Sequence, residues 1–168
     1  MTLRKAKRSD VPIIWKILQE AIERRRLEGS QQWQNGYPNP NSIQNDLEKG
    51  YAHVLEINEA IQAYVALIFD VDPAYEALQG KWLSNEKYLC IHRLAVSNSV
   101  IKKGVATRMF LLIEKIALKN SYYSIKLDTN FDNLPMLKIF KNLGYTYCGE
   151  VMIMGAPRMA YEKLLKKD

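Results

Sequence analysis

Apolar residues recur at helical spacing near the start of the chain, at Val11, Ile14, Leu18, Ala21 and Ile22. Charged residues fill positions between them, which is typical of an amphipathic helix with one buried face. Ser9, Asp10 and Pro12 suit the cap and first turn of this helix, and Gly29 suits its end. Residues 2–7 before it have extended character.

The next segments predict a loop, a short helix and a pair of strands. Residues 29–41 are rich in Gln, Asn, Gly and Pro and should form an ordered loop. Ser42 is expected to cap a short helix that Gly50 ends. Residues 51–57 and 60–70 then predict two strands joined by a tight turn.

The second half of the chain predicts alternating strands and helices. Residues 72–86 lack a sustained apolar period and should form an insertion. The pattern then predicts a strand over 88–96, a helix over 104–119, a strand over 124–129, a helix opened by Asn133 and Pro135 and ended by Gly144, and strands over 145–153 and 158–165. This order indicates one α/β (α+β) domain over residues 1–168, with a single mixed sheet and helices on both faces.

The composition is that of a globular protein, with 48% hydrophobic and 25% charged residues. The longest apolar stretches, such as residues 63–69, are too short to cross a bilayer, and no signal-peptide pattern opens the chain, so we expect a cytoplasmic protein with no membrane association. Cys90 and Cys148 lie in apolar runs and should be reduced core thiols. With only two histidines besides, and no metal-binding spacing, no metal site is expected.

The net charge of +6 favours a polyanionic partner, which could be nucleic acid, an anionic surface or a phosphate-rich cofactor. The basic runs Arg24–Arg26 and Lys163–Lys167 are also typical of a solvated helix face or tail. Because the sequence contains no recognised nucleic-acid-binding motif, we expect no nucleic-acid partner.

One segment carries candidate chemistry, HRLAVSNSVIKKGVATRMFLLIEKIA over residues 92–117. Here a strand runs into a polar loop, Gly104 and an amphipathic helix. Backbone N–H groups at a helix start bind phosphate, and a glycine lets the main chain approach closely. Lys102 and Lys103 would strengthen the attraction. One glycine beside two lysines is common, however, and neither GxxxxGK[ST] nor GxGxxG is present.

This segment and the order of elements resemble motif A of the GNAT superfamily of acetyl-CoA-dependent N-acetyltransferases, whose pattern is [Q/R]xxGx[G/A]. Ile101–Ala106 carry the pattern, with Ile101 in place of Gln or Arg. The resemblance implies a GNAT-like acyl-CoA N-acyltransferase fold with a mostly antiparallel sheet, and acetyl-CoA as a co-substrate whose pyrophosphate binds these main-chain amides. The cofactor-binding residues that it implies in this segment are Leu94, Ala95, Val96, Ile101, Lys102, Lys103, Gly104, Val105, Ala106 and Thr107.

Residues 133–145, NLPMLKIFKNLGY, resemble the family's motif B, NxxAxxxYxxxGF. The resemblance implies that Asn133 contacts the pantetheine arm and that Phe140 lies close to the thioester. The family more often has a tyrosine there as general acid for the departing thiolate, and phenylalanine cannot donate a proton. Water, Tyr145 or Tyr88 could supply that proton instead.

His92 is the candidate general base, because imidazole titrates near neutrality and the residue precedes the proposed thioester site on the same strand. HRLAV also resembles the arylalkylamine branch of the superfamily, in which a histidine here takes part in relaying the proton. The family's splayed strand end offers backbone N–H groups near Leu94 and Ala95 to the oxyanion. A structural histidine is the alternative, since one sequence does not show which face His92 occupies. Cys90, two residues earlier on the same face, is interpreted as core filler.

Aromatic residues fall in the two regions that shape the acceptor pocket in this family, namely Trp33, Tyr37, Tyr75 and Trp82. Ordinary packing at loop ends is the alternative for each of them. Three carboxylates could hold the positive charge of an acceptor, and their spacing does not distinguish Glu28, Asp70 and Asp128.

The resemblance implies an N-acetyltransferase that transfers the acetyl group of acetyl-CoA to a primary amine of a small molecule or amino acid derivative, by direct attack in a ternary complex. Protein N-terminal or lysine acetylation is one alternative, and a non-catalytic acyl-CoA-binding module is another. We expect a monomer or a homodimer.

Overall fold

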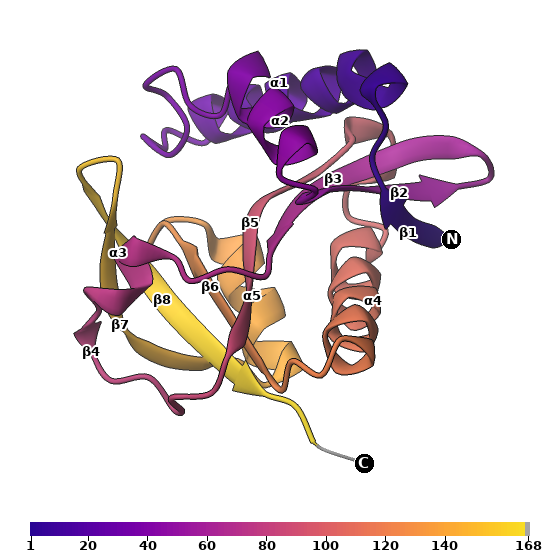
Figure 1. Ribbon diagram of the computed structural model, residues 1–168. Helices are drawn as coiled ribbons and strands as arrows, with labels where there is room; N and C mark the ends of the chain where they lie inside the picture. The colour runs from indigo at the N-terminus through magenta and orange to yellow at the C-terminus, as the bar shows by residue number, and fades with distance from the viewer. Residues whose placement is uncertain (167–168) are drawn as a thin grey trace. The chain divides into compact units, whose positions relative to one another are not determined.

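The computed structural model describes residues 1–166. Its elements are β1 (Thr2–Lys5), η1 (Arg8–Asp10), α1 (Val11–Leu27), α2 (Pro40–Glu48), β2 (Ala52–Ile57), β3 (Ala60–Ile68), α3 (Pro73–Glu76), β4 (Gln79–Gly80), β5 (Tyr88–Val96), η2 (Asn98–Val100), α4 (Val105–Lys119), β6 (Ser124–Thr129), α5 (Leu134–Leu143), β7 (Thr146–Ile153) and β8 (Ala156–Leu164) (Figure 1). Strand pairing runs in the order β1-β2-β3-β5-β6-β8-β7-β4. β5 and β6 are parallel, whereas β1–β2, β2–β3, β6–β8, β7–β8 and β4–β7 are antiparallel. The predicted mixed, mostly antiparallel sheet with helices is confirmed.

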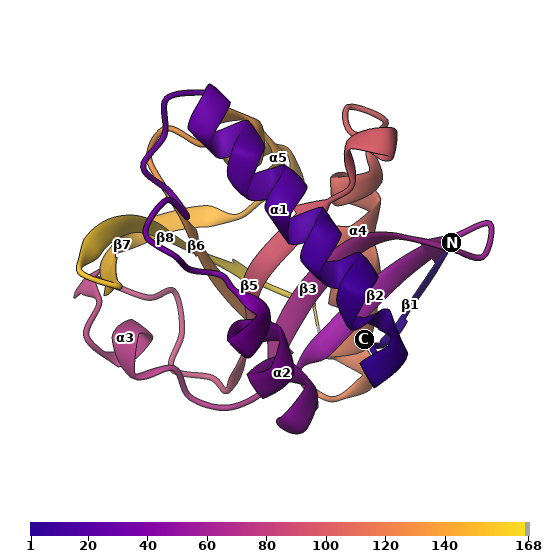
Figure 2. The same cartoon turned by 90° about the horizontal axis from the view of Figure 1, so that it is seen from above.

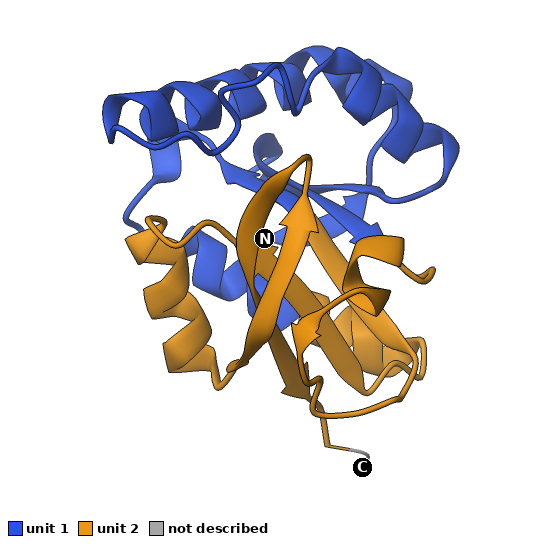
Figure 3. Ribbon diagram, turned by 90° about the vertical axis from the view of Figure 1, so that its left-hand side faces the viewer, with its two compact units in different colours: residues 1–67, 93–112 blue, residues 68–92, 113–168 orange. Residues whose placement is uncertain are grey.

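The chain divides into two compact units (Figure 3). Unit 1 comprises residues 1–67 and 93–112, and unit 2 comprises residues 68–92 and those from 113 onward. β5 contributes to both, because the division falls between His92 and Arg93. The assignment of residues 1–168 to one domain stays a prediction.

In unit 1, α1 and α2 pack on β2 and β3, and Figure 2 shows α1 crossing above these strands. The apolar face predicted for α1 supplies most of the helix side of this core, and burial of each such aliphatic side chain contributes about 1.5–3 kcal/mol. The buried residues of the cluster are Ile14, Ile17, Leu18, Ala21, Ile43, Ala52, Val54, Tyr64 and Ala95. The helix expected from the first apolar pattern is therefore confirmed as Val11–Leu27.

The cap of α2 differs from the sequence expectation. Asn39, and not Ser42, is the N-cap residue: its side chain accepts a hydrogen bond from Ser42 N–H at 3.1 Å, and Ser42 Oγ accepts one from Asn39 N–H at 3.2 Å. Pro40 at the first helical position favours this earlier start, because its ring fixes φ at a helical value. Ser42, the predicted cap, therefore lies inside the helix at position N3, where it forms a capping box with Asn39.

Unit 2 contains the segment that the sequence treats as an insertion. Residues 72–86 form α3 and the two-residue strand β4, which pairs with β7. Glu162 on β8, fully buried, anchors the end of this segment by accepting hydrogen bonds from Leu83 N–H at 2.6 Å and Ser84 Oγ at 2.8 Å. The insertion is thus tied to the sheet rather than freely exposed.

Two further sequence expectations concern thiols and membranes. Cys90 and Cys148 are both buried and free, as expected. Within residues 1–166, no helix is both long and apolar enough to span a bilayer.

Candidate functional site

The loop before α4 presents its main chain at a helix start in unit 1. Lys102 and Gly104 have left-handed backbone conformations, with φ of +62° and +72°. The N–H of Arg108 donates to Gly104 O at 3.1 Å, so the preceding amides belong to the first turn, where N–H groups have no partner inside the helix. A Cβ built on Gly104 would meet no protein atom within 4 Å. This bend offers amides and open space of the kind that a phosphate group needs.

The basic side chains of this loop are directed partly to its own backbone. Lys103 Nζ donates to Ser99 O at 2.9 Å, and Arg108 Nη2 donates to Lys103 O at 3.0 Å. Ile101 is exposed, at 38%. Binding of an anion at this bend stays a prediction, and it would depend on the amides and the helix dipole together with the charges of the lysines.

The regular geometry of β5 is interrupted next to its candidate site residues. Its last register partner on β6 is Ile91, opposite Leu127. Two residues later Arg93 has φ of +54°, a conformation that is uncommon for a residue with a side chain. Leu94 and Ala95 follow this kink directly, so the regular ladder with β6 ends before the amides that sequence reasoning assigned to an oxyanion.

His92 lies in a cluster of polar side chains of unit 2. Its Nε2 is 2.8 Å from Asp72 Oδ2, and its Nδ1 is 3.7 Å from Asp128 Oδ1. The Tyr75 hydroxyl donates to Asp128 Oδ1 at 2.6 Å, and the ring centroids of Tyr75 and His92 are 5.6 Å apart. His92 therefore occupies a face of β5 where two carboxylates meet it. Its role as general base stays a prediction.

Burial alone would lower the pKa of His92, but Cys90, the hydrogen bond with Asp72 and the charge of Asp128 raise that pKa well above its usual value. The protonated imidazolium is consequently favoured in the folded chain. A carboxylate only accepts, so Nε2–H is matched by Asp72, and Nδ1 is the atom that we expect to lose and regain the proton.

The raised pKa should make stability depend on pH above about 6.5, the ordinary pKa of histidine. His92 contributes its full stabilisation below that pH, and the contribution is lost as pH rises through the folded pKa. The free energy of unfolding, measured with urea across this range, should fall more steeply for the unmodified chain than for His92→Gln, which retains Asp72, Asp128, Cys90 and Tyr75. Parallel pH profiles for the two proteins would contradict this assignment.

Aromatic rings in the same unit surround a buried lysine that sequence reasoning did not single out. Lys126 Nζ lies 4.3 Å from the ring centroid of Trp82 and 4.1 Å from that of Tyr88. Trp82 Nε1 donates to Tyr75 O at 2.9 Å, and the Tyr88 hydroxyl accepts from Asp72 N–H at 3.0 Å. Trp82 and Tyr88 thus contact groups beside His92, and their roles toward a substrate or a leaving group stay predictions.

The two predicted pocket aromatics of unit 1 differ in their contacts. Trp33 packs against the apolar cluster of that unit, as ordinary packing would require. The Tyr37 hydroxyl accepts a hydrogen bond from Arg93 Nη1 at 2.5 Å. Tyr37 is therefore connected to the kinked part of β5, although nothing in its sequence position indicated this.

The motif B residues lie in unit 2, and two of them, Phe140 and Tyr145, are buried. Asn133 is the N-cap residue of α5, and Gly144 ends that helix with φ of +80°, as expected. Phe140 is 2% exposed and packs against Tyr145 and Tyr161, with centroid separations of 5.8 Å and 5.1 Å. Burial, with the charge of Glu114, raises the pKa of Tyr145 well above its usual value. Proton donation by Tyr145 stays a prediction.

Asp72, Cys90 and His92 bring three potential metal ligands within 4.8 Å of one another. Asp72 and His92 already form a hydrogen bond with each other, so each of these two side chains has a polar partner without an ion. The sequence expectation of no metal stays a prediction.

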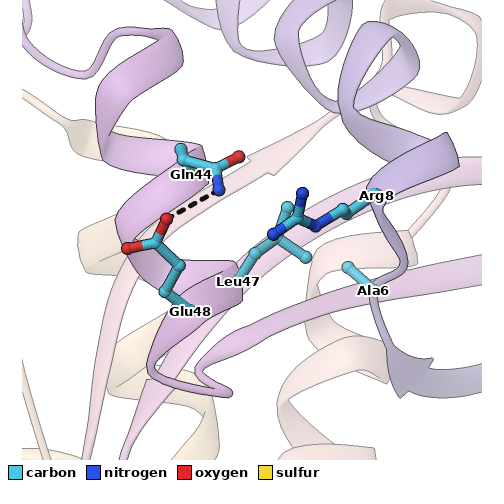
Figure 4. Close-up of a pocket in the computed structure, with 5 residues that line it drawn as sticks. All are labelled: Ala6, Arg8, Gln44, Leu47 and Glu48. Carbon is cyan, nitrogen blue, oxygen red and sulfur yellow. Dashed lines mark hydrogen bonds between the residues drawn. The ribbon is translucent and has the colours of Figure 1, made fainter.

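Unit 1 also contains a pocket, which is lined by Ala6, Arg8, Gln44, Leu47 and Glu48 (Figure 4). In this pocket the side chain of Gln44 donates a hydrogen bond to that of Glu48 at 2.8 Å.

Comparison with known proteins gives a consistent result. A family model for the acetyltransferase (GNAT) family matches residues 15–145. An acetyltransferase of the GNAT family from Streptococcus agalactiae is 34% identical with a TM-score of 0.89, over 99% of this chain and 96% of that one. A proposed acetyltransferase from Salmonella typhimurium, solved with its cofactor acetyl-CoA, is 14% identical and shares the fold with a TM-score of 0.70, over 100% of this chain and 95% of that one. No curated protein matches the chain.

Proposed function

Because the chain belongs to the GNAT acetyltransferase family, whose members transfer acetyl groups from acetyl-CoA, we propose that it acetylates a primary amine of a small molecule or amino acid derivative. Transfer would occur by direct attack in a ternary complex. The observation that supports this most directly is the contact of His92 on β5 with Asp72, which caps α3, and with Asp128 on β6.

The bend at Gly104 supports acetyl-CoA as co-substrate. Its φ of +72°, the open space beside it and the first-turn amides of α4 suit the close approach of a diphosphate. The proposed contacts are with the main chain from Lys102 to Thr107. The side chain of Ile101 is not needed for them.

The proposed role of His92 is to receive the proton of the acceptor. An ammonium group has no lone pair, so the amine must lose a proton before its nitrogen attacks. In the neutral form of His92, whose fraction grows as pH rises, Nδ1 would accept that proton, while Asp72 holds Nε2–H and Asp128 stabilises the resulting charge. Acetyl-CoA would supply the acetyl group: the amine nitrogen would add to the thioester carbonyl, the bond from carbon to sulfur would then break, and CoA would leave as a thiolate that takes up a proton from water, Tyr145 or Tyr88.

The carboxylates also support a cationic acceptor. Asp72 and Asp128 both face His92, and a cluster with two carboxylates attracts an amine in its protonated form. The proton then passes to His92 within the cluster. A small amine is favoured as acceptor because the side chains of His92, Asp72 and Asp128 are only 13%, 19% and 9% exposed.

The proposal is tested by incubating the chain with acetyl-CoA and a panel of small amines, amino acids and lysine peptides. We expect release of free thiol and a matching acetyl adduct by mass spectrometry for at least one small amine. Adducts on peptides alone would favour protein acetylation. Calorimetric binding of CoA with no thiol release for any amine would favour an acyl-CoA-binding module and overturn the catalytic proposal.

A further inference from the structure

The kink in β5 is held by a clamp of side chains that sequence reasoning did not identify. Arg93 Nη2 and Nε donate to the two carboxylate oxygens of Asp46 on α2, at 2.5 Å and 2.8 Å. Arg93 Nη1 donates to the Tyr37 hydroxyl at 2.5 Å, and the Tyr64 hydroxyl donates to Asp46 Oδ2 at 2.5 Å. Four segments of unit 1 therefore meet at this guanidinium and carboxylate, namely the loop that carries Tyr37, α2, β3 and β5.

The clamp is built as a buried, fully matched unit. Asp46 and Tyr64 are 0% exposed, and the side chain of Arg93 is 12% exposed. Burial and the neighbouring Asp46 raise the pKa of Tyr64, so its hydroxyl stays a donor to the carboxylate. A bidentate pair of arginine and carboxylate fixes orientation as well as distance. Arg93 can move only if several buried hydrogen bonds break.

The clamp holds the residue of β5 that has a positive φ. A left-handed conformation such as the φ of +54° at Arg93 persists only where the surroundings over-determine it. Arg93 is both the residue whose side chain Asp46 binds and the residue whose backbone has this unfavourable conformation. The directions of the next peptide groups, those of Leu94 and Ala95, follow from that backbone conformation.

We propose that Asp46 is a positioning residue for acetyl transfer, which acts through Arg93 to aim the amides of Leu94 and Ala95 at the thioester carbonyl. The proposal rests on the acetyltransferase function proposed above. Backbone N–H groups that point at the carbonyl oxygen stabilise the negative charge that develops on it during the reaction. Small displacements of these donors lower the reaction rate strongly. Asp46 itself touches neither substrate.

The test compares Asp46→Asn with a matched control, Asp10→Asn, because Asp10 also accepts from an arginine, Arg4, in unit 1. Both changes remove a paired charge and should lower stability. Asp46→Asn is expected to reduce kcat by about 10- to 100-fold, whereas Asp10→Asn should leave kcat within about twofold at a temperature where both are folded. Tyr64→Phe, which keeps the pair of Asp46 and Arg93, should give a smaller reduction.

Binding supplies a readout that does not depend on turnover. Calorimetry should show that the unmodified chain binds acetyl-CoA more tightly than CoA, since only acetyl-CoA has a thioester carbonyl for these two amides. Asp46→Asn should lose this preference while its Kd for CoA stays within about twofold. Retention of both the preference and kcat in Asp46→Asn would overturn the positioning role alone. Failure of the unmodified chain to bind either compound would overturn the proposed function and this inference together.

Discussion

Replacing His92 with alanine is expected to lower kcat by about 10²- to 10⁴-fold, the usual contribution of a positioned proton acceptor, and to leave the Kd for CoA within about twofold. His92 is the group that Asp72 and Asp128 orient, and it has no place in the proposed diphosphate site around Gly104. Steady-state kinetics with the best amine, together with calorimetry, would separate the two effects.

The other histidine of the chain provides the control. His53 on β2 is also buried, and its Nδ1 is bonded to Tyr51 O at 2.7 Å in unit 1. His53→Ala should reduce stability without a comparable loss of kcat. Equal losses of kcat in both variants would show that removing a buried histidine acts through folding, and the assigned role of His92 would be wrong.

The pH profile gives an independent check on His92. Since only the neutral ring accepts a proton, kcat/KM should rise with pH through an apparent pKa above the ordinary value for histidine. Asp72→Asn replaces the charged acceptor of this hydrogen bond by a neutral amide, which favours the charged ring less, so the apparent pKa of that variant should be lower. An unchanged apparent pKa in Asp72→Asn would assign the titration to another group.

Substituting Gly104 by valine is expected to weaken CoA binding by about 10- to 100-fold. A β-branched side chain strains a backbone with φ of +72°, and its methyl groups would fill the open space beside the first-turn amides of α4. The protein itself offers no clash there, because no protein atom lies within 4 Å of the added Cβ. The loss should therefore come from the ligand side, as a higher Kd in calorimetry.

Gly155 is a matched control for this substitution. It has φ of +76°, and a Cβ there would likewise meet no protein atom within 4 Å, but it lies in the turn between β7 and β8. Gly155→Val should carry a similar backbone cost, about 1–3 kcal/mol, without altering the Kd for CoA. If the two variants weaken CoA binding equally, the bend at Gly104 is not the diphosphate site.

Local patterns in the sequence were sufficient to predict most elements. The helical spacing of Ile14, Leu18 and Ala21 correctly marked the buried face of α1. The glycine after α5 predicted its end, because few residues other than glycine adopt the left-handed conformation that Gly144 has. These features depend on neighbours within a few positions, which is why one sequence reveals them.

The sequence predictions were less accurate where two neighbouring residues were both suited to one role, or where a segment is ordered by contacts with residues far away in the sequence. Ser42 and Asn39 are both good capping residues, and only the backbone at Pro40 decides between them. Residues 72–86 lack an apolar period because their order comes from contacts with β7 and with Glu162. Such contacts leave no trace in the spacing of the segment itself.

The sequence by itself determined most elements and the family resemblance, and it singled out the segment around His92 and Gly104. Only the tertiary structure showed that Asp72 and Asp128 lie beside His92, and that Asp46 accepts hydrogen bonds from Arg93, which is 47 positions away in the sequence. The physical reason is that helix and strand periodicity comes from local backbone geometry, whereas the pKa of a histidine and the strain at a kink depend on side chains that folding brings together.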